Sequence, residues 1–286
     1  MTSYIEKWQL TTGREIEPDA LPPKQSAWDQ PCVLIDRESV ESSLTDTEQK
    51  ARFLAVSAPH SGDWLLALPL ASCGLRLDNE AVRVAVSLCL GVSLGAPHPC
   101  QCGAEVDARG LHSFVCKKAS GRIARHQQLN DMVARTLASV GVPASKEPVG
   151  LSRSDGKRPD GMSLIPWQGG KLLVWDVTVT TTLADSYVAS AARRAGEVAE
   201  LAAARKRAKY SEISNSYHFL PLAFENLGPV NMEAFQFLYS LGHRLSDISG
   251  DSRETSYLFQ RFSSMIQRFN SVLFRDSFVS LAESDL

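Results

Sequence analysis

One strand-like segment constrains the fold of this chain more than any other feature. The run from Leu173 to Val179 is apolar apart from Asp176 and Thr178, and it is rich in the β-branched and aromatic residues that form strands. A buried ionised carboxylate costs on the order of several kcal/mol unless it is paired or bound to a metal. The chain must therefore fold so that Asp176 meets a partner.

The segments around this strand alternate between helical and extended patterns. The spacing of apolar residues predicts a helix over 123–140, strands over 144–151, 160–165 and 172–180, and a long helix over 184–210. A strand over 218–225, a helix over 232–247 and a helical region over 254–282 follow. Gln168, Gly169 and Gly170 predict a hairpin turn before the third strand. The order α-β-β-β-α-β-α from residue 123 indicates an α/β fold class.

The first ninety residues carry weaker patterns. Residues 1–50 are polar and interrupted by turns, as at Glu17-Pro18-Asp19, so we interpret them as a loosely packed arm or as the end of an upstream domain. Residues 47–54 resemble a short helix and residues 63–68 an apolar packing segment. Asp78 is placed to cap a helix that runs through Leu90 and ends at Gly91.

Four of the candidate metal ligands are closely spaced. Cys100, Cys102, His112 and Cys116 supply three thiolates and one imidazole, the tetrahedral set that zinc prefers, and four protein ligands would make the ion structural. The first pair is closer than the usual C-x2 to C-x4 spacing, so two loop cysteines, a surface histidine and a buried cysteine are the alternative. His98 is the fallback ligand.

The two cysteines nearest to this cluster lack such a pattern. Cys73 and Cys89 lie in apolar stretches, and we expect both to be buried as small hydrophobic residues.

The net charge of −2 conceals an uneven distribution. Residues 101–210 contain 17 Lys and Arg against 10 Asp and Glu, whereas the rest of the chain is acidic. A basic middle segment suggests that it binds a polyanion. Solvated helix faces that are merely basic are the alternative.

Three carboxylates are candidates for a catalytic metal site. Asp160 begins one predicted strand, Asp176 lies inside the next, and Glu147 lies on the strand before. Converging carboxylate oxygens suit Mg²⁺ or Mn²⁺, which would orient a phosphodiester and a water for in-line attack. A turn aspartate at 160 and a strand-end Asp176 paired to an arginine are the alternative.

The combination of these motifs resembles a known family. The element order, with Glu147, Arg158-Pro159-Asp160 and Asp176-Val177-Thr178, resembles the PD-(D/E)XK restriction-like nucleases. The similarity is greatest to the endonuclease region that follows the reverse transcriptase of site-specific non-LTR retrotransposons, where a zinc knuckle precedes a helix rich in arginine and histidine, here residues 125–130. The resemblance covers about residues 95–225.

The resemblance implies a domain organisation and an activity. It implies a connector or remnant of an upstream domain over 1–94, a zinc knuckle over 95–120, a restriction-like core over 121–230 and a helical extension over 231–286. It further implies a metal-dependent DNA endonuclease, acting in the nucleus, that nicks target DNA for retrotransposition. No Asp-Asp pair of the polymerase type occurs in the chain, so the chain is not itself a reverse transcriptase.

One position departs from the general nuclease pattern. The lysine expected two residues after the second acid is Thr178 here. In the retrotransposon branch a Lys-x-x-Lys-Tyr pattern on the following helix supplies it, and Lys206, Lys209 and Tyr210 match that pattern. Lys206 is then the candidate catalytic lysine. A solvated basic helix end or a nuclear-import patch is the alternative for these lysines.

These features lead to expectations about partners. We expect DNA, or structured RNA, to contact Arg122, Arg125, His126, Lys157 and Arg158, and a homodimer is one way to cut both strands. The runner-up function is a zinc-stabilised nucleic-acid-binding module that has lost cleavage, and a scaffold protein is a third. The chain shows no secretory or membrane-spanning pattern, so we expect a protein that is not secreted. The resemblance implies a nuclear location, and a cytoplasmic one is the alternative.

Overall fold

The structure is a computed structural model of the chain, and it describes residues 2–17, 21–151 and 156–278. The chain divides into two compact units, residues 1–50 and residues 51–286. Helix α3 (Thr47–Val56) runs across this boundary. The finer division predicted from sequence, with boundaries before residues 95, 121 and 231, stays a prediction.

The first unit is more ordered than the sequence indicates. It contains α1 (Thr2–Thr12) and α2 (Gln25–Ser43), where a loosely packed arm or the end of an upstream domain was expected. The indole of Trp8 contacts that of Trp28 edge to face, and Trp8 Nε1 donates to the Trp28 carbonyl at 2.8 Å. Pro31 lies inside α2. Because proline in a helix interior usually breaks the helix, the sequence pattern does not predict α2. The predicted turn at Pro18-Asp19 falls outside the described residues.

A four-stranded mixed sheet forms the centre of the second unit. Its strands are β3 (Ala144–Lys146), β4 (Gly161–Gln168), β5 (Lys171–Thr180) and β6 (His218–Glu225), in that spatial order. The pairs β3–β4 and β4–β5 are antiparallel, whereas β5 and β6 are parallel. Gly169 and Gly170 both have positive φ, as a two-residue hairpin turn requires, which confirms the predicted hairpin.

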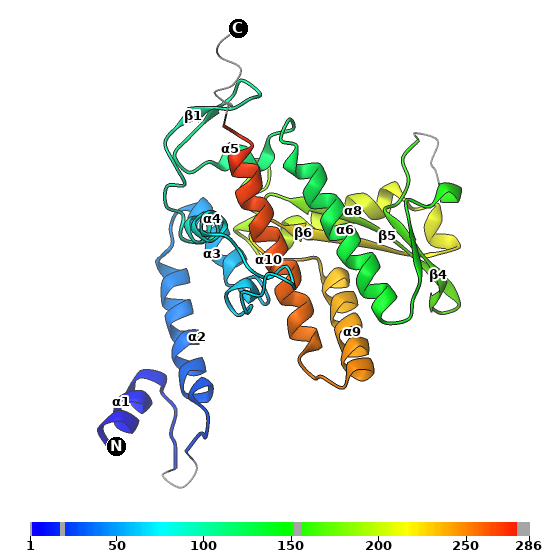
Figure 1. The fold of residues 1–286 in the computed structure, drawn as a ribbon. Helices are drawn as coiled ribbons and strands as arrows, with labels where there is room; N and C mark the ends of the chain where they lie inside the picture. Colours follow the sequence, from blue (N-terminus) through cyan, green and yellow to red (C-terminus); the bar gives the residue numbers. More distant parts are fainter. Residues whose placement is uncertain (1, 18–20, 152–155, 279–286) are drawn as a thin grey trace. The chain divides into compact units, whose positions relative to one another are not determined.

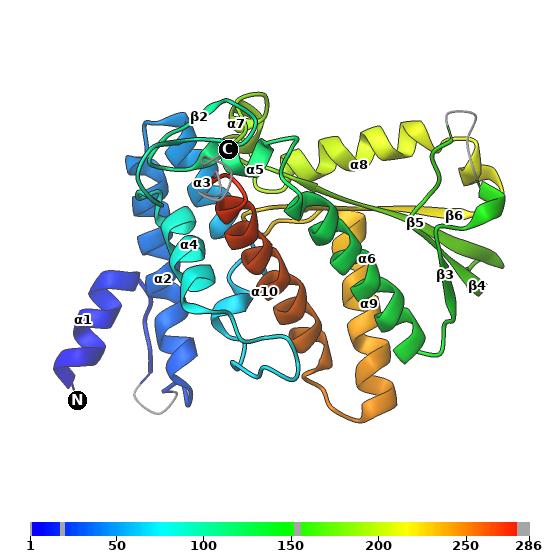
Figure 2. The same cartoon turned by 45° about the horizontal axis from the view of Figure 1, so that its top comes forward.

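Helices cover both faces of this sheet (Figures 1 and 2). Helices α6 (Gly121–Ser139), α9 (Met232–Ser249) and α10 (Glu254–Arg275) lie on one face, and α8 (Glu197–Lys209) lies on the other. Alternate residues of β5 point to opposite faces. Trp175 and its neighbours at alternate positions pack in the large core with α6, α9 and α10, whereas Val174 packs with Tyr210 beyond the end of α8.

The predicted order of elements from residue 123 is observed, but the first strand and the long helix differ from their predicted bounds. The first strand ends at Lys146 and not at residue 151, because Glu147 has a φ of 47° and a 3-10 turn follows over Val149–Leu151. The long helix is two helices, α7 (Val188–Ala191) and α8, since the chain turns at Gly196 with a φ of 80°.

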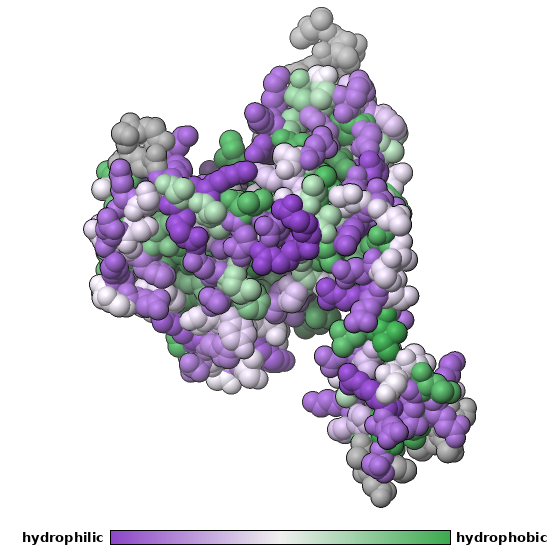
Figure 3. Space-filling model, turned by 180° about the vertical axis from the view of Figure 1, so that it is seen from behind, coloured by the Kyte–Doolittle hydropathy of each residue, from purple (hydrophilic) through white to green (hydrophobic). Residues whose placement is uncertain are grey.

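The segment before the zinc ligands matches its prediction in part. Asp78 Oδ1 accepts from the Ala81 amide at 2.7 Å and caps α4 (Asn79–Leu90), which ends at Gly91 in the left-handed region, as expected. The prediction that residues 63–68 pack in the interior holds for Trp64 and is wrong for the leucines after it. Leu66 is 71% exposed, and apolar residues lie among hydrophilic ones on the surface in Figure 3.

The remaining elements are short or C-terminal. They are the 3-10 turns Asp63–Leu65 and Ile213–Asn215, strands β1 (His98–Pro99) and β2 (Glu105–Val106), and α5 (Leu111–Val115). Helix α10 ends at Arg275, whereas the sequence predicted helical structure to residue 282. Residues 276–278 are not helical, so the prediction is wrong there, and residues 279–282 lie outside the described part of the chain.

The prediction that Cys73 and Cys89 are buried is wrong. Cys73 is exposed and Cys89 only half-buried, so neither is the buried residue predicted. Within the described ranges, no helix combines the length and the apolar character needed to cross a membrane.

Candidate active site and candidate zinc centre

Asp160 and Asp176 lie opposite each other on neighbouring strands. Gly161 pairs with Trp175 in the β4–β5 register, and the Asp160 amide donates to the Trp175 carbonyl at 3.0 Å. A Cβ atom on Gly161 would lie 2.0 Å from the Trp175 ring, so only glycine fits after Asp160. The close packing of this ring against the backbone therefore fixes where β4 begins.

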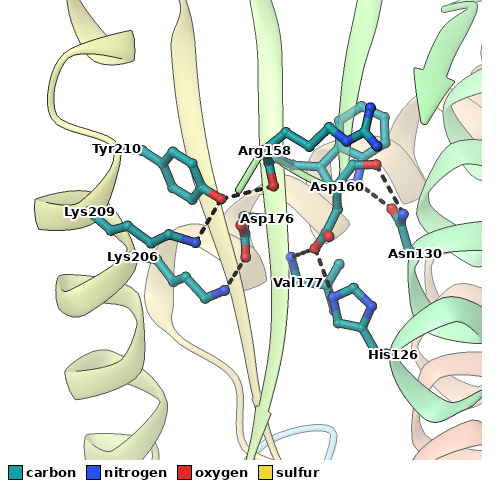
Figure 4. Close-up of polar contacts among 10 residues, drawn as sticks. His126, Asn130, Arg158, Asp160, Asp176, Val177, Lys206, Lys209 and Tyr210 are labelled. Atoms are coloured by element: carbon teal, nitrogen blue, oxygen red, sulfur yellow. Dashed lines mark hydrogen bonds and ion pairs between the residues drawn. The ribbon is translucent and has the colours of Figure 1, made fainter. Parts of the chain in front are cut away.

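The Asp160 carboxylate is held on one oxygen. Its Oδ2 accepts from His126 Nε2 at 2.9 Å and from the Val177 amide at 2.6 Å (Figure 4). Asn130 Nδ2 donates to the Asp160 carbonyl at 3.0 Å, and Asn130 Oδ1 accepts from Trp175 Nε1 at 2.7 Å. Helix α6 thus holds Asp160 with two side chains, and the hydrogen bond to Asp160 raises the pKa of His126.

Asp176 is the most buried carboxylate of this site, with 3% of the residue exposed. Burial and the nearby charge of Asp160 raise the pKa of Asp176, and the ion pair with Lys206 opposes this rise. Lys206 reaches Asp176 from α8 (Figure 4). The arrangement is two neighbouring carboxylates with one lysine ion-paired to Asp176, which leaves the Asp160 charge for a further cation to offset.

The end of α8 is tied to the segment before Asp160. The Tyr210 hydroxyl donates to the Arg158 carbonyl at 2.9 Å, and Lys209 Nζ donates to the same hydroxyl at 2.9 Å. Tyr210 is buried, and these partners satisfy its hydroxyl. Lys209 therefore contacts Tyr210, which also hydrogen-bonds to Asp176, whereas Lys206 contacts the Asp176 carboxylate directly.

Glu147 joins this group through its backbone only. Its amide donates to the Asp160 carbonyl at 3.0 Å. Its side chain is 68% exposed and pairs with Arg158 at 3.5 Å. The left-handed backbone at Glu147 ends β3 and turns the chain, so the expected convergence of three carboxylates is observed for Asp160 and Asp176 and not for Glu147. Lys157 and Arg158 lie exposed on the loop next to it.

The two arginines expected to contact nucleic acid lie differently. Arg122 is half-buried and donates to the Val115 and Cys116 carbonyls at 3.5 and 3.4 Å. Arg125 is only 3% exposed, and its Nε and Nη1 have no hydrogen-bond partner among the described residues. Burial, with the charge of Arg122, lowers the pKa of Arg125 to about 10. Arg125 is therefore an interior side chain and not part of an accessible phosphate-binding surface.

The predicted zinc ligands converge. The ligand atoms of Cys100, Cys102, His112 and Cys116 all lie within 4.8 Å of one another, and the cluster could hold a zinc-type ion. Cys100 Sγ lies 3.7 Å from Cys116 Sγ, close to the ~3.8 Å edge of a tetrahedron with zinc–sulfur bonds of about 2.3 Å. Cys102 Sγ lies 3.1 Å from His112 Nε2.

The backbone around these ligands brings them together. The amide of Cys100 donates to the Ala104 carbonyl and the amide of Gly103 to the Cys100 carbonyl, each at 2.8 Å, which folds a knuckle between β1 and β2. The Ala104 amide lowers the pKa of Cys102 to about 7, as suits a thiolate ligand, while burial raises the pKa of Cys100 to about 11. Zinc would have to supply the charge that deprotonates the buried thiol.

Neighbouring residues complete this centre. Gly110 has a φ of 67° and packs against Phe274, where a Cβ would lie 2.8 Å from the ring. Both ring nitrogens of His98, the fallback ligand, have partners outside the cluster: Nδ1 contacts the Ala96 carbonyl and Nε2 contacts Ser277 Oγ. The knuckle is thus built into the second unit, in one apolar cluster with α4 and α10.

Asn130 and Tyr210 are site residues whose roles the sequence did not reveal. Asn130 lies four residues after His126 and therefore on the same face of α6, which is the one signal that links it to Asp160. Thr178 follows Asp176 by two residues and lies on the same face of β5, toward α8. Lys206 supplies on that face the cation that position 178 lacks.

Comparisons with known proteins add no assignment. The chain matches no protein-family model, and no curated protein matches it. The function therefore has to be argued from the geometry of the site.

Proposed function

We propose that this chain is a metal-dependent DNA endonuclease module of the restriction-like type, related to the nuclease region of non-LTR retrotransposons. The observation that carries the proposal is the position of Asp160, directly before β4, beside Asp176 on β5, with Lys206 reaching Asp176 from α8. The order of helices and strands, the knuckle before α6 and the basic middle segment support it.

The donor set fits a hard divalent cation. The two carboxylates are neighbours on β5 and at the start of β4. Burial, together with the charge of Asp160, raises the pKa of Asp176, so a cation between them would relieve their repulsion. Asp160 and Asp176 would hold Mg²⁺ or Mn²⁺, which when bound polarises a phosphodiester and activates a water. Glu147 is exposed and is not needed in this set.

The residues of the chain have separate tasks in this proposal. Lys206 supplies the positive charge that stabilises the phosphorane, in place of a lysine at position 178. Tyr210 holds the Arg158 carbonyl and so fixes the segment that carries Asp160. Lys157 and Arg158 are exposed beside the site, where they would bind phosphates of DNA.

A second function, nucleic-acid binding without cleavage, has one specific observation in its favour. Thr178 occupies the strand position where the general pattern has lysine, and Lys206 is engaged with Asp176. The zinc knuckle and the basic segment would then serve binding alone.

Nicking of supercoiled plasmid separates the two functions. The wild-type protein should nick in Mg²⁺ and stop in EDTA, whereas Asp176→Asn and Asp160→Asn should bind DNA and leave it uncut. Asp251→Asn, in the exposed pair with Arg253, is the matched control and should nick normally. Binding without nicking by the wild-type protein would establish the second function.

A further inference from the structure

The contacts to Asp160 are unequal between its two oxygens. Both the His126 imidazole and the Val177 amide contact Oδ2. Among the residues that the structure describes, no donor contacts Oδ1. An oxygen that already accepts two hydrogen bonds is a poorer metal ligand, so Oδ1 is the atom that Asp160 can offer to a cation.

The two donors to Oδ2, the Val177 amide and the His126 imidazole, differ in whether they can move away from it. The Val177 amide belongs to β5 and is fixed by the sheet. His126 is a side chain on α6 whose neighbour one turn on, Asn130, holds the Asp160 carbonyl. The Asp160 backbone is held by Asn130 and by the sheet, so the imidazole is the side chain that controls rotation of the Asp160 carboxylate about the Cβ–Cγ bond.

We propose that His126 is a positioning residue that reserves Oδ1 of Asp160 for the metal ion and so makes the site prefer Mg²⁺ over Ca²⁺. The inference rests on the proposed function and adds a selectivity determinant to it. Mg²⁺ requires near-ideal octahedral geometry with short bonds, which a single carboxylate oxygen satisfies, whereas Ca²⁺ accepts both oxygens of one carboxylate and more ligands. Without the imidazole, the Val177 amide alone restrains Oδ2, so Asp160 can rotate more readily to present both oxygens, which suits Ca²⁺.

The role assigned to His126 differs from a contact with DNA. The His126 side chain is 40% exposed, but its Nε2 contacts Asp160, so it acts on the metal through a ligand. A side chain that only donates an N–H should therefore replace it. The Nε2 atom of glutamine can occupy a similar place to the imidazole Nε2, which makes His126→Gln the conservative test.

Calorimetric titration of the purified full chain with MgCl2 and with CaCl2, in the absence of DNA, tests the inference. His126→Ala and His126→Leu should weaken Mg²⁺ binding by about 10-fold to 100-fold, the usual cost of losing a partner of a ligand, and weaken Ca²⁺ binding less. His126→Gln should keep the wild-type preference. His243→Ala, an exposed histidine on α9 that packs on Tyr239, is the control and should bind both ions normally.

The outcomes separate this inference from the proposed function. Wild-type binding that is lost in Asp176→Asn establishes the metal site, and an unchanged ratio of the two affinities in both His126→Ala and His126→Leu then overturns the role of His126 alone. A glutamine variant that behaves like the alanine variant overturns it as well. Wild-type protein without any binding that depends on Asp176 would overturn the metal site and this inference together.

Discussion

Replacing Lys206 with methionine removes the cation that pairs with the buried Asp176 carboxylate. Methionine keeps most of the apolar stem of lysine, so the packing against β5 changes little. Asp176 would then lie beside Asp160 without its ion-pair partner. Since burial and the Asp160 charge already raise the pKa of Asp176, losing Lys206 should raise that pKa further.

The magnitude follows from the linkage between ionisation and folding. Each additional unit in the folded-state pKa costs about 1.4 kcal/mol at a pH above both pKa values. Breaking a buried pair costs about 3–5 kcal/mol, but the Lys206 side chain is 25% exposed and water screens part of the interaction. We therefore expect Lys206→Met to lower the free energy of unfolding by roughly 2 kcal/mol at neutral pH.

The sign of the pH dependence is fixed by the direction of the shift. The pKa of Asp176 is raised in the folded state, so ionisation of Asp176 favours unfolding. The penalty is absent below the unfolded pKa of about 3.9, grows as the pH rises from there to the folded pKa, and is complete above the folded pKa. The destabilisation by Lys206→Met should thus be small near pH 4.5 and large near pH 7.5.

Urea unfolding at these two pH values measures the effect. The double variant Lys206→Met/Asp176→Asn should recover stability relative to Lys206→Met at neutral pH, because no charge is left unpaired. An equal loss of stability at both pH values, or no recovery in the double variant, would show that Lys206 does not neutralise Asp176.

Three further predictions concern the zinc centre, the DNA contacts and the start of β4. Purified protein should contain about one zinc per chain, and Cys102→Ser should lose zinc and the order of the knuckle; a metal-free preparation with unchanged unfolding would exclude this. DNA affinity should fall steeply and linearly with the logarithm of salt concentration, and Lys157→Ala with Arg158→Ala should reduce that slope, whereas a flat dependence would refute phosphate binding. Gly161→Ala should cost about 1–3 kcal/mol through overpacking, while Gly150→Ala, which meets open space at an ordinary φ, should change stability little in the same denaturation assay.

The sequence predicted the parts of the site that depend on residue type and spacing. Asp160 and Asp176 could be placed on neighbouring strands because the apolar runs and the diglycine turn predict a hairpin. Which residues lie opposite each other near Asp176 could not be predicted from the turn, because the register shifts twice along β4, between Met162 and Pro166 and between Pro166 and Gln168. The zinc ligands could be found because three cysteines and a histidine within a short stretch are typical of a metal site.

The remaining features depend on three-dimensional packing. The outward turn of Glu147 follows from one left-handed residue that propensity does not favour. The burial of Arg125 and the hydrogen bond from Asn130 to Asp160 depend on how α6 is rotated against the sheet, which periodicity locates only coarsely. The break at Gly196 was hidden in an alanine-rich stretch that favours helix.

Asp160, Asp176 and Lys206 are proposed to form a cleaving site although position 178 carries threonine. The most direct test is the single-turnover rate of plasmid nicking in Mg²⁺ for Lys206→Ala beside the wild type. Loss of the charge that stabilises the transition state should lower the rate by on the order of 10²–10³, and Lys209→Ala, whose ammonium contacts Tyr210, should cost less. Full activity of Lys206→Ala would contradict the assignment of the lysine, and a wild type that never nicks would contradict the nuclease itself.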